Sequence, residues 1–174
     1  MQIEVASLSA SGKTFEHHYQ AGELVLEDER VRLIDPQPAV SGRARTDHGR
    51  VKVTGEFTAN LQLECDRCLK SVDSSVKGTF SREYATAAEY EAQRAVELSE
   101  DDLDLSIYDG QVIDIDGLIR EELLLAAPDP LLCQPDCRGI CPTCGADLTA
   151  GNCNCEATDI DPRWAALKEL VNGK

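Results

Sequence analysis

The sequence predicts an α+β protein: an antiparallel β-sheet, which could close toward a barrel, followed by a few helices and a C-terminal cysteine-rich module. Three observations predict this class. Apolar and polar residues alternate over residues 51–64, residues 114–127 carry apolar residues at helical spacing, and six of the eight cysteines fall between residues 133 and 155. We therefore expect a sheet domain over residues 1–130 and a module with a terminal helix over residues 131–174.

The first half of the chain is expected to consist of strands. Residues 1–40 combine short apolar runs with turn signals such as Asp35-Pro36. The alternation over residues 51–64 is typical of a half-buried antiparallel strand, and Gly55 within it predicts a bend or bulge. Residues 72–84 supply the partner strand, so the loop between the two strands, with Cys65 and Cys68, is predicted to be a hairpin tip.

Two helices and an acidic segment are predicted further along. Residues 85–110 are rich in carboxylates; an acidic surface helix followed by a solvated loop is the simpler interpretation, and a contact for a basic partner is the alternative. The helix over residues 114–127 begins at a cap, Asp114 or Asp116, and ends before Pro128. A second helix is expected over residues 161–171.

The charge is strongly acidic and unevenly distributed. The chain has 32 acidic and 17 basic residues, a formal net charge of −15, and residues 85–174 contain 19 of the acids and 6 of the bases. This balance excludes binding to nucleic acid through the whole surface, because phosphate neutralisation supplies most of that affinity. It suits a basic partner, such as a ribosomal protein.

A local basic patch is nevertheless present around a predicted hairpin turn at Asp47-His48-Gly49. Solvated strand ends are the simpler interpretation of these cations, because exposed Arg and Lys are the usual protein surface. Contact with RNA phosphate or with a partner is the functional alternative. The candidate residues for it are Arg43, Arg45, Arg50 and Lys52 around the turn and Arg67 and Lys70 beside the first cysteine pair.

The cysteines indicate metal binding. No apolar run has the length of a membrane span or of a signal peptide, so we expect a cytoplasmic protein, where clustered cysteines are metal ligands more often than disulfides. Thiolates favour Zn²⁺, with an iron–sulfur cluster as the alternative, and eight of them suffice for two closed structural sites. The segment Cys141-Pro-Thr-Cys144-Gly145 has the form of a zinc knuckle, because Pro presets the turn and Gly permits a positive φ.

The simplest partition of the ligands assigns the four local cysteines to one ion and the other four to a second. The first set is Cys141, Cys144, Cys153 and Cys155, and the second is Cys65, Cys68, Cys133 and Cys137. A crossed assignment, which pairs the two CxxC segments, stays open at this point. Because four thiolates leave no position for water, neither site is suited to Lewis-acid chemistry. The sequence also lacks a nucleophile elbow, a phosphate loop and a dinucleotide fingerprint, so we expect neither catalysis nor a small-molecule substrate.

Together these segments resemble the YceD family of large-subunit ribosomal RNA accumulation proteins. The resemblance rests on Cys65-Asp-Arg-Cys68-Leu69, the helix that ends at Pro128, the cysteine cluster and Asp161-Pro-Arg-Trp164. It implies a non-enzymatic bacterial factor that supports accumulation of large-subunit rRNA and hence ribosome biogenesis. Some members of the family lack the C-terminal cysteines, which implies that the metal module stabilises or extends the fold.

Two functional hypotheses follow. The first is an assembly factor that contacts large-subunit rRNA or a pre-50S particle, or a basic ribosomal protein; the acidic total favours contact through protein. The second is a zinc- or redox-responsive adaptor that binds protein and has no RNA contact. Sensitivity to salt would indicate the first, and joint release of metal and partner on mild oxidation would indicate the second.

Overall fold

The chain divides into two compact units. The computed structural model describes residues 1–93, 105–155 and 163. Unit one comprises Met1–Glu64 and Ser71–Leu131, and unit two comprises Cys65–Lys70 and Leu132–Lys174. The loop Cys65–Lys70 joins two strands of unit one, yet it clusters with the cysteine-rich segment. Unit two is therefore built from two stretches of sequence that are far apart along the chain.

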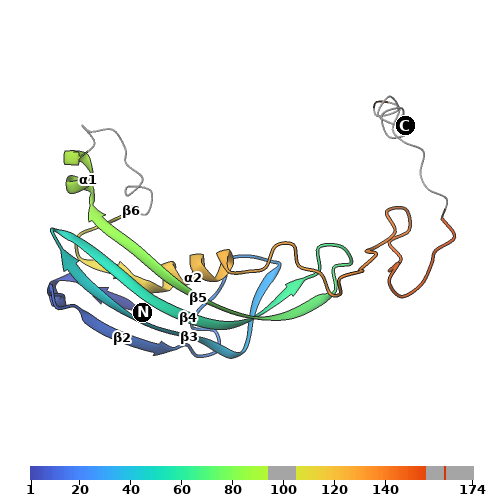
Figure 1. The fold of residues 1–174 in the computed structure, drawn as a ribbon, viewed down its shortest axis with the longest axis horizontal. Coiled ribbons are helices and arrows are strands. Elements are labelled where there is room, and N and C mark those ends of the chain that lie inside the picture. Colours follow the sequence, from blue (N-terminus) through green and yellow to red (C-terminus); the bar gives the residue numbers. More distant parts are fainter. Residues whose placement is uncertain (94–104, 156–162, 164–174) are drawn as a thin grey trace. The chain divides into compact units, whose positions relative to one another are not determined.

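Unit one is mainly β-structure, which confirms the α+β class (Figure 1). A five-stranded sheet has the order β2 (Lys13–His18), β3 (Val31–Asp47), β4 (Arg50–Glu64), β5 (Ser71–Thr86) and β6 (Leu105–Tyr108). A separate two-stranded ribbon pairs β1 (Gln2–Glu4) with β7 (Val112–Asp114), and the 3₁₀ turn η1 (Val5–Ser7) follows β1.

The alternating segment forms strand β4 as predicted. Its odd-numbered apolar residues are buried, and it pairs with β5 from Val51 opposite Tyr84 to Glu64 opposite Ser71. The turn between β3 and β4 is the expected two-residue hairpin, with φ of 49° at His48 and 87° at Gly49. Positive φ at both positions is what a tight turn needs to match the twist of the strands.

Three details of the predicted sheet are wrong. The described strands form an open sheet and not a closed barrel, with β2 and β6 at the two ends of the strand order. The sheet is mixed, because β6 runs parallel to β5 while the other neighbours are antiparallel. Residues 105–108, expected in a solvated loop, form β6. The connection over residues 87–104, which begins with α1 (Ala87–Gln93), has the length that a parallel crossover requires.

Gly55 does not create a bulge, because the pairing of β4 continues through it. It provides space instead: a Cβ at Gly55 would lie 2.6 Å from Cζ of Phe80 and 2.4 Å from the carbonyl oxygen of Ser41. Each of the three phenylalanines of the chain lies opposite a glycine of a neighbouring strand in this way: Phe15 with Gly42, Phe57 with Gly78 and Phe80 with Gly55. An aromatic ring over a strand glycine covers backbone that has no side chain of its own.

The irregularity that Gly55 was expected to cause lies in β3, where the register shifts between Ile34 and Ala39. Pro36 and Pro38 fall in this stretch and cannot donate to the ladder. The shift also changes which positions face the core, from the odd residue Val31 to the even residue Val40. The Asp35-Pro36 signal therefore marks a break inside one strand and not a turn between two.

The predicted helix is α2 (Ile115–Leu125), and it supplies one side of the core of unit one. Asp114 is its N-cap and accepts a hydrogen bond from the backbone N–H of Asp116. Its apolar stripe packs against the inner face of the sheet (Figure 1); the stripe consists of Ile115, Leu118, Ile119 and Leu123, and the sheet contributes Val51, Val53, Phe57, Phe80 and Tyr84. The helix thus closes one face of the sheet and leaves the other face polar.

Two expectations fall wholly or partly outside the described residues. The helix expected over residues 161–171 lies outside them, apart from residue 163, and so does the part of the acidic segment over residues 94–104. In the described part of the chain, no helix combines the length and the apolar character needed to cross a membrane.

Candidate metal centres

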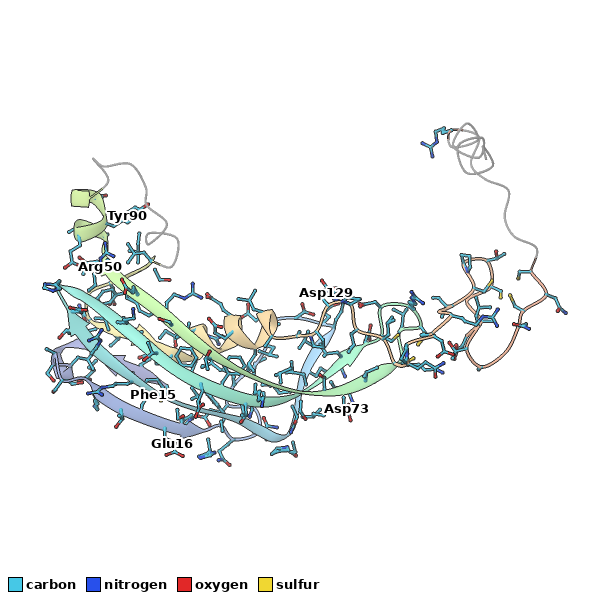
Figure 2. All side chains as sticks on the ribbon, viewed as in Figure 1. Phe15, Glu16, Arg50, Asp73, Tyr90 and Asp129 are labelled. Atoms are coloured by element: carbon cyan, nitrogen blue, oxygen red, sulfur yellow. The ribbon has the colours of Figure 1, made fainter. Side chains whose placement is uncertain are left out.

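Unit two brings the eight cysteines together as two sets of four. The first set is Cys65, Cys68, Cys133 and Cys137, and the second is Cys141, Cys144, Cys153 and Cys155. Within each set the sulfur atoms all lie within 4.8 Å of one another. The structure thus has the simplest partition of the ligands and not the crossed one. Figure 2 shows the sulfur atoms, in yellow, among the loops of this unit.

The sulfur separations fit a tetrahedral ion and not disulfides. The Sγ atoms of Cys65 and Cys137 are 3.8 Å apart, and those of Cys68 and Cys133 are 3.5 Å apart. Four sulfurs at ~2.3 Å from a central Zn²⁺ would be about 3.8 Å from one another. All eight cysteines are free thiols. Either set could hold a metal ion.

Both CxxC segments form the same knuckle. In the second, the N–H of Gly145 donates to the carbonyl of Cys141 at 2.8 Å, and the N–H of Cys141 donates to the carbonyl of Ala146 at 2.8 Å. In the first, the N–H of Leu69 donates to the carbonyl of Cys65, and the N–H of Cys65 to that of Lys70, both at 2.9 Å. The sequence predicted the knuckle only in the second segment, since the first has Leu and not Gly at the position of positive φ.

In each set, the knuckle points backbone N–H groups toward one sulfur atom. Burial opposes ionisation of Cys65, but the N–H groups of Arg67, Cys68 and Cys133 lower its pKa to about 6. The N–H groups of Cys144 and Thr143 likewise lower the pKa of Cys141 to about 6. One thiolate in each set is therefore stabilised by the fold before a cation contributes.

One other cysteine in each set behaves in the opposite way. The Cys133 thiol contacts Cys68 and is partly buried, which raises its pKa to about 12. Contact with Cys144 and burial raise the pKa of Cys155 to about 12 as well. Each additional thiolate must form beside existing negative charge, so complete ionisation of a set requires a positive ion at its centre.

The first set is held by contacts between the hairpin loop and the C-terminal stretch. Arg67 donates from Nη1 to the carbonyl of Cys137 at 2.7 Å, and Nζ of Lys70 lies 2.5 Å from Oδ2 of Asp147. The N–H of Ile140 also donates to the carbonyl of Arg67. Three of the four ligands in this set are buried, whereas only Cys141 is buried in the second set and Cys144 and Cys155 are exposed. The two centres therefore differ in access to solvent.

All six cations that the sequence nominated for phosphate or partner contact already have partners within the chain. Arg67 and Lys70 are engaged in unit two, as described above. Four lie near the β3–β4 turn of unit one, where Figure 2 labels Arg50. Arg50 and Lys52 both approach Glu83, at 3.4 and 3.1 Å, Arg45 lies 3.6 Å from Asp47, and Arg43 donates to the carbonyl of Ser11.

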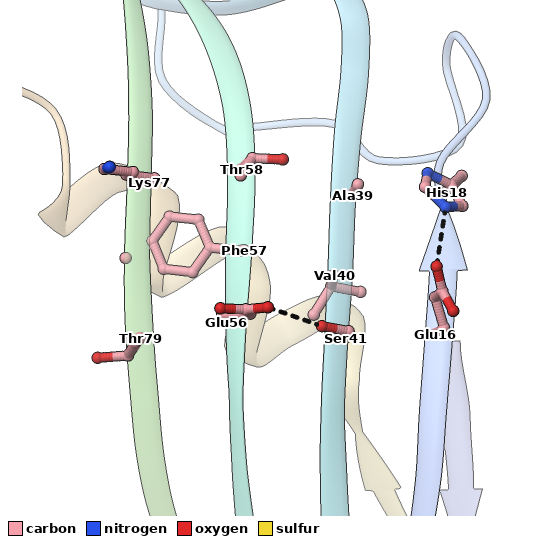
Figure 3. Close-up of a pocket in the computed structure, with 11 residues that line it drawn as sticks. Glu16, His18, Ala39, Val40, Ser41, Glu56, Phe57, Thr58, Lys77 and Thr79 are labelled. Carbon is pink, nitrogen blue, oxygen red and sulfur yellow. Dashed lines mark hydrogen bonds and ion pairs between the residues drawn. The ribbon is translucent and has the colours of Figure 1, made fainter.

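The polar face of the sheet is hollowed but not basic. An open hollow of about 510 Å³ lies over strands β2 to β5, with Glu16, His18, Glu56 and Lys77 among the side chains that line it (Figure 3). Oε1 of Glu56 accepts a hydrogen bond from Ser41 at 3.4 Å, and Glu16 one from His18 at 3.3 Å. The lining has two carboxylates and one lysine, which is a poor match for phosphate.

These features define a class of protein: a β-sheet unit covered by one helix, joined to a small unit organised around two four-thiolate centres. Residues 53–171 match the family described as "Large ribosomal RNA subunit accumulation protein YceD". The chain belongs to this family, as its sequence motifs implied.

The chain is also similar to bacterial proteins of unassigned role. It is 35% identical over 121 residues to the uncharacterized protein Rv2926c of Mycobacterium tuberculosis, across 70% of this chain and 56% of that protein. It is 26% identical over 158 residues to the uncharacterized protein YlbN of Bacillus subtilis, across 90% and 87% of the two chains. The match thus spans little more than half the length of the mycobacterial relative. No solved structure matches the chain.

Proposed function

We propose that the protein is a non-enzymatic factor that supports accumulation of large-subunit (23S-type) rRNA and ribosome biogenesis through a protein-mediated contact with the pre-50S particle. The observation that carries the proposal is membership of the family named for large ribosomal RNA subunit accumulation, over residues 53–171. The charge supports contact through protein: the net charge is −15, and the six candidate cations are occupied within the chain.

We propose that the two cysteine sets bind one Zn²⁺ each and that the ions have a structural role. Cys65, Cys68, Cys133 and Cys137 would hold one ion, and Cys141, Cys144, Cys153 and Cys155 the other. A zinc ion in each set would neutralise crowded thiolates and fix the loops of unit two. Four sulfur ligands complete its coordination, so the centre serves the fold and not a reaction.

The test of this function is the ratio of mature large- to small-subunit rRNA in cells depleted of the protein. We expect the ratio to fall, with unprocessed precursor ends, and to recover with the wild-type chain. A chain truncated after residue 131 separates the roles of the two units: recovery with it would assign the function to unit one. An unchanged ratio with a normal ribosome profile would refute the proposal.

The exposure of Cys144 and Cys155 favours a second candidate, a redox-responsive adaptor that binds protein and not RNA. Its signature is joint loss of the second metal ion and of the partner under mild peroxide, reversed by a reductant and zinc. Retention of the partner after loss of that ion would exclude the adaptor and leave the structural role of the centre.

A further inference from the structure

A second hollow, in unit one, is acidic and aromatic. It has a volume of about 530 Å³ and lies where β6, the loop after it, β7 and the first turns of α2 meet. We name it the α2 hollow; its lining includes Tyr84, Tyr108, Asp109, Asp114, Leu118 and Glu121. Three carboxylates and no cation line it among the described residues. Such a lining selects a positively charged group.

Two of the three carboxylates keep acceptor capacity for a ligand; the third, Asp114, accepts the N–H of Asp116 through Oδ1, and its Oδ2 lies 3.6 Å from Nη2 of Arg120. Glu121 is exposed, and only its Oε2 contacts a cation, Arg82 at 3.6 Å. Asp109 uses Oδ1 to accept the N–H groups of Gln111 and Val112. In the described part of the chain, Oε1 of Glu121 and Oδ2 of Asp109 have no hydrogen bond or ion pair.

Tyr84 provides an independent indication of a ligand. The residue is only 9% exposed, it lines the hollow, and its hydroxyl has no hydrogen-bond partner among the described residues. Burial, with the charges of Glu121 and Asp114 opposed by Arg82, raises the pKa of Tyr84 to about 12, so the hydroxyl stays protonated. No buried side-chain polar atom of the described residues lacks a partner, so this hydroxyl lies at the accessible surface of the hollow, where it can accept a hydrogen bond from a donor.

The shape of the lining favours arginine over a metal ion or lysine. The only groups of potential ligand atoms close enough for a shared ion, in the described residues, are the two cysteine sets. The rings of Tyr84 and Tyr108 meet edge to face with centroids 6.4 Å apart, which gives the hollow an aromatic wall. A planar guanidinium can stack on such a ring and donate to several carboxylate oxygens at once.

We propose that the α2 hollow binds an arginine side chain from a basic segment of a partner protein. This inference rests on the proposed function, in which the partner is a protein of the pre-50S particle, and it assigns the surface that the partner uses. RNA is disfavoured as the occupant, because its phosphates would face three carboxylates.

The test is fluorescence anisotropy of a short labelled peptide of alternating Arg and Ser with the full-length zinc-loaded chain. Lys-Ser and citrulline-Ser peptides of equal length serve as comparisons. Lysine keeps the positive charge without the guanidinium, and citrulline keeps the planar shape without the charge. We expect Glu121→Gln to weaken binding of the Arg peptide about fivefold or more, as for loss of a charge-assisted contact. Tyr84→Phe should weaken it about threefold, as for loss of one hydrogen bond.

Glu16→Gln is the matched control, since it removes the same charge from the exposed surface of β2, away from the α2 hollow. We expect its effect to stay within about twofold, because screening weakens distant surface charges. Equal weakening by Glu16→Gln and Glu121→Gln, or equal affinity for the citrulline peptide, would overturn the proposal. Urea unfolding of each variant checks that the fold is retained. If Glu121→Gln does not fold, Glu121→Ala takes its place.

The peptide measurement uses no ribosomes, so it can fail while the rRNA ratio still depends on the protein. The ratio can equally stay normal on depletion while the peptide binds. Amide shifts of residues 105–121 on addition of an rRNA fragment alone, strengthened in Glu121→Lys as phosphate contact requires, would replace the protein partner by RNA and refute the proposal. Amide shifts confined to residues 105–121 on addition of the Arg peptide would place it as proposed.

Discussion

Single residues decide how the metal centres form. Gly145 has φ of 72°, as the knuckle motif predicted, and Leu69 holds the equivalent position in the first set with φ of 61°. A side chain in this region costs free energy that glycine avoids. The sequence revealed the second knuckle through its glycine; the first is recognisable only in the structure, where its hydrogen bonds repeat those of the second.

Gly145→Val should therefore weaken the second centre and spare the first. Nothing lies within 4 Å of a Cβ at Gly145, so the effect isolates backbone strain from crowding. We expect the affinity of the second centre for zinc to fall about tenfold, since strain of this kind costs ~1–3 kcal/mol. Leu69→Gly is the control and should not weaken the first centre. Competition with a chromogenic chelator measures the zinc affinity of both centres. An unchanged zinc affinity of the second centre in Gly145→Val would contradict the argument.

Elements with local signals were predictable, and those that depend on distant pairing were not. The alternation of β4, the His48-Gly49 turn and the apolar stripe of α2 each depend on residues that are close together in the sequence. The register shift in β3 and the parallel strand β6 depend on partners far along the chain. The bulge predicted at Gly55 is wrong because the role of this glycine is set by Phe80 on the next strand, which the local pattern does not contain.

The cysteine-rich element has almost no apolar core. The buried hydrophobic side chains of unit two, among the described residues, are four cysteines: Cys65, Cys68, Cys137 and Cys141. Both apolar clusters of the structure lie in unit one. Ions bound in the two cysteine sets, as proposed, would therefore supply most of the stabilisation of unit two. The sheet of unit one has an apolar core of its own.

Removal of metal by a strong chelator should unfold unit two and leave unit one folded. We expect the amide resonances of residues 132–155 to collapse to random-coil positions, while those of β4 and α2 keep their dispersion. Mass spectrometry of the native protein should give two zinc ions per chain, and Cys65→Ser with Cys137→Ser should give one. Loss of the sheet resonances together with the metal would show that the two units are one cooperative structure.

At the scale of the whole molecule, the distribution of charge distinguishes the two contacts considered for the proposed ribosomal role, one with RNA and one with a basic protein. Basic residues of the β3–β4 turn region form ion pairs with acids of their own chain. The electrostatic potential of this basic patch is therefore less positive than its sequence suggests. The excess of acids lies in residues 85–174, which include the lining of the α2 hollow. On a particle that presents both RNA and basic proteins, this acidic chain would bind through the basic proteins.

The joint variant Arg43→Gln, Arg45→Gln and Arg50→Gln should therefore keep its association with pre-50S particles, whereas Glu121→Lys should lose it. Three phosphate contacts would steepen the logarithmic salt dependence of binding by about two to three units, and their loss would flatten it by the same amount. We expect a change of less than about one unit, because these guanidinium groups already have intrachain partners. Sedimentation of labelled protein with particles at several salt concentrations measures the slope. Loss of association in the triple variant, with Glu121→Lys unaffected, would transfer the contact from protein to RNA.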